Sequence, residues 1–177
     1  AGAAERAARA LGLRRGPIHA ELRLDGREPW LIELAARPIG GLCSRALRFG
    51  DGASLEELIL RQALGMETAS LAREARSAGV MMIPVPGAGP LERVEGREDA
   101  EGVPGIERVI ITAYPGEWLT PFPEGSRYPG FLFARGDDPA TVEAALREAH
   151  RRLRFVLTPV SEVPTPAGPA GAAGSSR

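Results

Sequence analysis

Two glutamates and an arginine occupy positions from which they could bind a metal ion and a phosphate together. Glu21 lies in one stretch where apolar and polar residues alternate, residues 18–24, and Glu33 lies in a second, residues 30–37. Such alternation is typical of strands with one apolar face. Carboxylates are ligands that Mg²⁺ prefers, and Arg37, four residues beyond Glu33 on the same predicted face, suits bidentate binding of a phosphate or carboxylate.

The turn residues 25–29 separate the two stretches and predict a β-hairpin. With the apolar residues on one face and a three-residue loop, the register is expected to pair Leu24 with Trp30, Leu22 with Ile32 and Glu21 with Glu33. Opposed like charges destabilise a sheet by a few tenths to about 1 kcal/mol, and a bound divalent cation would remove that repulsion. The alternative is an ordinary solvated surface, where Glu21 and Glu33 lie near arginines such as Arg23. His19 on the same face is either a functional contact or a surface residue.

The strings GPIHAELRL, from Gly16, and LIELAARPIGGLCSR resemble the C-terminal half of the ATP-grasp fold. They are most similar to the branch of bacterial L-amino-acid ligases and biotin-carboxylase-like relatives. In that family, an acidic residue on one strand and the Glu of an E-x-N-x-R motif on the next hold the Mg²⁺ of Mg·ATP. The resemblance therefore implies that Glu21 and Glu33 bind metal and nucleotide, with ATP and Mg²⁺ (or Mn²⁺) as cofactors, and that Arg37 is the catalytic, phosphate-binding residue. Ala35 stands where the motif has Asn, which removes one usual contact.

The resemblance continues in SLEELILRQALG, GVMMIPVPGAGPLERVEG and YPGFLFARG, which resemble the small C-terminal domain of these ligases. It implies an α+β fold: the C-terminal part of an ATP-grasp fold, an antiparallel sheet with helices, followed by a small α+β domain. The expected division is 1–65 for the ATP-grasp subdomain with its metal-binding hairpin, 66–160 for the ligase-associated domain and 161–177 for a disordered tail.

Capping and periodicity predict the remaining elements. Ser54 followed by Glu57 is a capping box that opens a helix ending at Gly65. Asp138-Pro139 opens the clearest helix, with apolar spacing that continues to Val156. Further expected helices are 3–13, 42–48 and 68–77, and expected strands are 80–85, 91–94, 109–113 and 130–134, with a loop over 114–128.

Composition excludes several classes of function. The chain has 177 residues with 22 basic and 23 acidic side chains, a balance unlike that of a dedicated nucleic-acid-binding surface. Its longest apolar run, residues 80–85, is too short to span a membrane. One cysteine, Cys43, cannot form an internal disulfide, which favours a cytoplasmic location. The chain contains no lysine, so it cannot by itself carry out any chemistry that needs a lysine side chain.

Lysines of the lid contact the phosphates in ATP-grasp enzymes, so the resemblance implies that N-terminal and lid portions come from the same protein or from a partner chain. The isolated chain is then expected to be inactive. The parent protein is expected to be an ATP-dependent carboxylate–amine ligase that acts on small molecules through an acyl-phosphate. The alternatives are a biotin-carboxylase-like activity, a degenerate paralogue, or a non-catalytic or split-gene module that binds a partner chain. A module of that kind predicts an exposed apolar patch around the hairpin.

Overall fold

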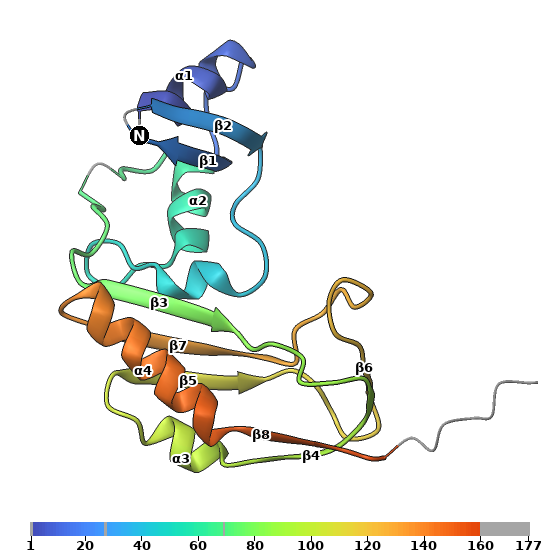
Figure 1. The fold of residues 1–177 in the computed structure, drawn as a ribbon. Coiled ribbons are helices and arrows are strands. Elements are labelled where there is room, and N and C mark those ends of the chain that lie inside the picture. The colour runs from blue at the N-terminus through green and yellow to red at the C-terminus, as the bar shows by residue number, and fades with distance from the viewer. Residues whose placement is uncertain (1, 27, 69, 160–177) are drawn as a thin grey trace, which may run out of the picture.

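The computed structural model describes residues 2–26, 28–68 and 70–159, which fold as a mixed α+β structure with antiparallel sheets (Figure 1). The elements in chain order are α1 (Gly2–Ala10), β1 (His19–Asp25), β2 (Glu28–Ala35), the 3₁₀ helix η1 (Cys43–Ala46), α2 (Leu55–Ala63), β3 (Ser77–Met82), β4 (Gly89–Glu95), α3 (Arg97–Glu101), β5 (Ile106–Ile111), β6 (Trp118–Leu119), β7 (Gly130–Gly136), α4 (Pro139–Arg152) and β8 (Arg154–Leu157).

The N-terminal part consists of the β1–β2 hairpin, α1 beside it, and α2, which lies between the hairpin and the rest of the molecule (Figure 1). The predicted capping box forms at α2, because the Ser54 hydroxyl accepts a hydrogen bond from the backbone N–H of Glu57 at 3.1 Å. This bond satisfies one of the N–H groups that have no partner within the helix.

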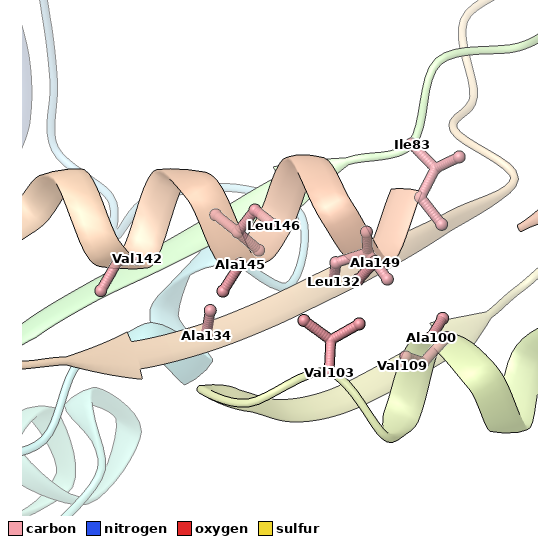
Figure 2. Close-up of a cluster of buried hydrophobic side chains, with 10 residues drawn as sticks. All are labelled: Ile83, Ala100, Val103, Val109, Leu132, Ala134, Val142, Ala145, Leu146 and Ala149. Carbon is pink, nitrogen blue, oxygen red and sulfur yellow. The ribbon is translucent and has the colours of Figure 1, made fainter. Parts of the chain in front are cut away.

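The C-terminal part is built on an antiparallel sheet in the order β3-β7-β5, with α4 across one face. A second sheet, in the order β6-β4-β8, lies beside it. Figure 2 shows the core, in which side chains of α4 meet Leu132 and Ala134 of β7, and Val103 approaches from the segment after α3. The helix begins as predicted, since the Asp138 carboxylate accepts a hydrogen bond from the Thr141 N–H at 2.9 Å.

Strand β7 is buried along its whole length, because both of its faces are covered. Leu132 and Ala134 belong to the core under α4. The alternate side chains face the segment around η1, where Arg135 donates a hydrogen bond to the carbonyl of Ala46 at 3.2 Å. The sheet therefore joins the N-terminal part to the C-terminal core.

Three expectations about the elements are wrong. Residues 68–77 form no helix where the structure describes them, because Gly50 N–H donates to Ala72 O and Glu74 N–H donates to Arg48 O, which holds this segment extended. The last helix ends at Arg152, and β8 follows it where helical spacing was expected. Elements α3, β6 and β8 were not predicted.

The division near residue 65 stays a prediction, and the expected tail 161–177 lies outside the described residues. Across the described ranges, no helix has the length and apolar character needed to cross a membrane.

Candidate metal and phosphate site

The hairpin places Glu21 directly opposite Glu33, as the sequence predicts. In an antiparallel pair, the Cα atoms of opposed residues are about 4.5–5.5 Å apart and their side chains share a face. The two glutamates of this pair therefore lie on one face of the hairpin, on neighbouring strands.

The rest of the predicted register is wrong, because β2 contains a bulge. The register shifts between Glu21 and Leu22, so Ile32 has no partner opposite it. The observed pairs are Leu24 with Pro29, Arg23 with Trp30, and Leu22 with Leu31. Since Trp30 lies opposite Arg23, its indole lies on the carboxylate face and not with Leu24. Hydrophobic alternation does not reveal a bulge, so nothing in the sequence indicated this position of Trp30.

Both glutamates are exposed, and neither carboxylate makes a hydrogen bond or ion pair with any residue that the structure describes. Over the same residues, no group of three His, Cys, Asp or Glu side chains lies close enough to hold a metal ion. The pair is thus unlike a closed zinc or calcium site. It matches the requirement of Mg²⁺, which is usually held by one or two carboxylates and completed by water and substrate phosphates. His19, half-buried at the end of β1 opposite Ala35, is not brought to the pair as a third ligand.

Arg37 lies two residues beyond the end of β2, exposed, in the segment that leads to η1. Its guanidinium donates a hydrogen bond to the carbonyl of Pro38 at 3.1 Å and makes no ion pair with the described residues. The side chain is therefore near the pair in sequence, and most of its donors are available to an anion.

The apolar side chains of the hairpin are exposed, against the expectation of a half-buried face. Leu24, Trp30 and Ile32 are 78%, 62% and 66% exposed. Among the residues that the structure describes, helix α1 packs beside β2. The exposed apolar side chains lie on both faces of the hairpin, since Trp30 shares the face of the carboxylates and Leu24 lies on the other.

Arg135, whose side chain is 3% exposed, connects the two parts of the molecule. It donates to Glu74 at 2.6 Å, to Glu107 at 3.1 Å and to the carbonyl of Ala46. Glu107 also receives the guanidinium of Arg48 at 3.0 Å. The network holds the segment after the hairpin against β5 and β7. The sequence signals this network through an arginine within the otherwise apolar string GFLFARG, but it does not identify the partners of that arginine.

Comparison with known proteins agrees with this architecture. Residues 1–46 match the ATP-grasp domain family, and residues 81–158 match the family described as L-amino acid ligase C-terminal domain 2. The crystal structure of the L-amino acid ligase from Bacillus licheniformis is 32% identical, with a TM-score of 0.71, over 86% of this chain and 39% of that one. The crystal structure of phosphoribosylglycinamide synthetase from Anaerococcus prevotii has the same fold, with a TM-score of 0.70 at 15% identity, over 87% of this chain and 40% of that one.

A curated protein of Sinorhizobium fredii, uncharacterized protein y4rH, is 24% identical over 90% of this chain and 33% of its own length. The chain thus spans about two fifths of the solved structures it matches and a third of this relative.

Proposed function

Since the chain corresponds to the C-terminal portion of an ATP-grasp ligase of the L-amino acid ligase branch, we propose that the protein joins a carboxylate to an amine at the expense of ATP, through an acyl-phosphate. The observation that carries the proposal is the opposed, unpaired Glu21 and Glu33 on the strands that match the ATP-grasp domain. Small-molecule carboxylates and amines, amino acids among them, are the proposed substrates.

In this proposal, Glu21 and Glu33 hold Mg²⁺ or Mn²⁺, which when bound supplies positive charge to the phosphates of ATP. The two carboxylates would fix that charge at one place on the hairpin, since positioning and charge neutralisation are most of what phosphoryl transfer requires. Arg37 would exchange its exposed bond to the Pro38 carbonyl for the transferred phosphate, which offers it two oxygens in place of one. Ala35 donates and accepts nothing through its side chain, so the protein contributes one ligand fewer than the family motif.

The rest of the nucleotide site would come from N-terminal and lid portions, in the same protein or in a partner chain. Two observations support this part of the proposal. The chain has no lysine, and the hairpin exposes Leu24, Trp30 and Ile32 where another layer could cover them. By the same reasoning, the isolated 177-residue chain would turn over no ATP.

The decisive experiment compares Glu33→Gln with Glu28→Gln in the native gene product at its full length. Both changes remove one exposed carboxylate from β2, but Glu28 lies opposite Asp25, outside the Glu21–Glu33 pair. We expect Glu33→Gln to abolish amino-acid-dependent release of phosphate from ATP, and Glu28→Gln to retain it. Turnover near wild type in Glu33→Gln would refute the role. ADP release that depends on bicarbonate would identify the biotin-carboxylase-like alternative.

A second candidate is a non-catalytic or split-gene module, which the exposed apolar surface of the hairpin favours. The mass of the polypeptide in its source cells separates the two candidates. A product much heavier than 18.7 kDa supports the ligase, with all portions in one chain. A product of about 18.7 kDa supports the split-gene reading, and ATP turnover would then require the missing portions from another chain.

A further inference from the structure

A cavity of about 370 Å³ opens between the segment around η1 and the C-terminal sheet. In Figure 1 this is the junction where the cyan segment meets the sheet that contains β3, β7 and β5. The volume lies in the range of small-molecule sites, roughly 300–1,000 Å³. The cavity is lined by Arg45, Leu47, Arg48, Gly52, Ser54, Glu56, Glu107, Arg108 and Phe133.

The charged side chains of this lining do not balance. Three are arginines and two are glutamates. The carboxylate of Glu107 is already shared between Arg48 and the buried Arg135, which leaves it little capacity for a further cation. Neither the guanidinium of Arg45 nor that of Arg108 makes a hydrogen bond or ion pair with any residue in the described ranges.

Glu56, the second carboxylate, is held by a different partner. The Ser44 hydroxyl donates to it at 2.6 Å. This hydrogen bond is the main cause that lowers the pKa of Glu56, with a smaller contribution from the charge of Arg45. Glu56 is therefore ionised near neutral pH and fixed toward Ser44, while the guanidinium donors of Arg45 remain open to the cavity.

The lining also has an apolar part, which is formed by Leu47 and Phe133. Phe133 is 4% exposed and belongs to the face of β7 that is turned toward the η1 segment. A ligand that fits the cavity therefore combines an anionic group with an apolar body, because guanidinium donors and an aromatic side chain line one space.

We propose that this cavity is a binding site for a small organic oxyanion, a carboxylate or a phosphate monoester with an apolar substituent, held between Arg45 and Arg108. Arg45 lies in η1 and Arg108 in β5, so the ligand bridges the N-terminal part and the C-terminal sheet. None of Glu21, Glu33 and Arg37 lines the cavity, so the proposal does not rest on the proposed ligase activity.

The test is a calorimetric titration of the 177-residue chain at low ionic strength, where surface charge is least screened, with phenyl phosphate, phenylacetate and inorganic phosphate in separate runs. We expect at least one of the two aromatic anions to bind more tightly than inorganic phosphate, and the better one identifies the anionic group. Arg45→Gln and Arg108→Gln should each weaken that binding by at least about tenfold, the usual weight of a hydrogen bond from a charged donor.

Arg147→Gln is the matched control, because it removes an equal charge from an exposed position on α4, away from the cavity. Its affinity should equal that of the wild type. Equal affinity in Arg45→Gln, Arg108→Gln and Arg147→Gln would overturn the proposal, as would the absence of binding of all three anions at millimolar concentration. Circular dichroism and a melting curve of each variant distinguish a loss of binding from a loss of fold. We expect the fold to be retained, because both arginines are exposed.

Discussion

The guanidinium of Arg135 and the carboxylate of Glu74 lie 2.6 Å apart, although 61 positions separate them in the chain. The side chain of Arg135 is 3% exposed, whereas that of Glu74 is 28% exposed. The same guanidinium reaches Glu107 and Ala46, so one side chain from β7 joins three other segments. The arrangement explains how a charged residue is accommodated within an otherwise apolar strand, since each nitrogen of the guanidinium has an acceptor.

Replacing Arg135 by Met should lower the free energy of unfolding by about 2 kcal/mol, because Glu74 loses its partner and Glu107 loses one of its two arginines at a junction that stays folded. The estimate is below the usual cost of breaking a buried pair, since Glu74 and Glu107 are about 30% exposed and water partly replaces the arginine. Urea unfolding measures the difference. Arg147→Met, from the exposed pair with Glu143, should change stability by less than about 0.5 kcal/mol, and an equal loss in both would contradict the prediction.

Adding a methyl group at Gly79 should also destabilise the chain. A Cβ there would lie 2.7 Å from Cγ1 of Val142 and 2.9 Å from Cδ1 of Leu146, both on α4. The side chains of Val142 and Leu146 would have to shift, and we expect Gly79→Ala to cost about 1–3 kcal/mol, the range for overpacked cores. Gly87→Ala serves as the control, since its Cβ would be no nearer than 3.4 Å to Leu157. A melting temperature for Gly79→Ala at or above that of Gly87→Ala would show that α4 is less closely packed than described.

The cap of α4 predicts a pH-dependent stability. Hydrogen bonds from the Thr141 hydroxyl and then from its N–H hold the pKa of Asp138 below its ordinary value of 3.8. A carboxyl whose pKa is lower in the folded state stabilises the fold above the ordinary value, and that contribution disappears as the pH falls through the folded value.

Asp138→Ala should therefore lower the melting temperature at pH 7, and its difference from the wild type should shrink as the pH drops below 3.8. Asp137→Ala, which removes a 96% exposed neighbour outside the cap, should have little effect at either pH. Melting curves of the three proteins over pH 2.5–7 make the comparison. If the difference in melting temperature between Asp138→Ala and the wild type is constant with pH, the ionised cap is not its cause.

The opposed carboxylates of the hairpin should reduce stability when no metal is bound, and they should bind a metal ion when one is supplied. Glu33→Gln is expected to raise the free energy of unfolding of the metal-free chain by a few tenths to about 1 kcal/mol, because one like-charge pair is removed. The same change should abolish broadening by Mn²⁺ of the backbone amide resonances of residues 19–23 and 31–35.

Glu28→Gln separates the two effects of that change. It relieves the repulsion between Asp25 and Glu28, so it should also stabilise the hairpin while retaining the broadening by Mn²⁺. If Glu28→Gln removes the broadening and Glu33→Gln does not, the cation lies at the tip of the hairpin and the assignment of Glu21 and Glu33 is wrong.

Patterns local to one element predicted the fold well. The hairpin, the pairing of Glu21 with Glu33 and the start of α4 at Asp138 follow from alternation and capping, which a few neighbouring residues encode. The position of Trp30 could not be predicted, because the bulge at Ile32 moves the indole to the other face and leaves the alternation unchanged.

Contacts between distant segments account for the other errors. Residues 70–74 have a helix-like composition, but their backbone groups bond to residues 48–50 and the segment stays extended. Likewise, Val156 continues the helical spacing of α4, yet it pairs with Arg93 of β4 and belongs to β8. Local sequence carries no record of these partners.

The complete burial of β7 has a consequence for how the protein is made. Strands β3 and β5 have no hydrogen bonds to each other, since each pairs with β7. Ala46, Glu74 and Glu107 all leave the ribosome before Arg135 does, and Ala46 precedes it by 89 positions. Until residues 130–136 emerge, β3 and β5 lack the strand with which both of them pair, and Glu74 lacks the guanidinium of Arg135. Unpaired strand edges of this kind favour chaperone binding and mispairing.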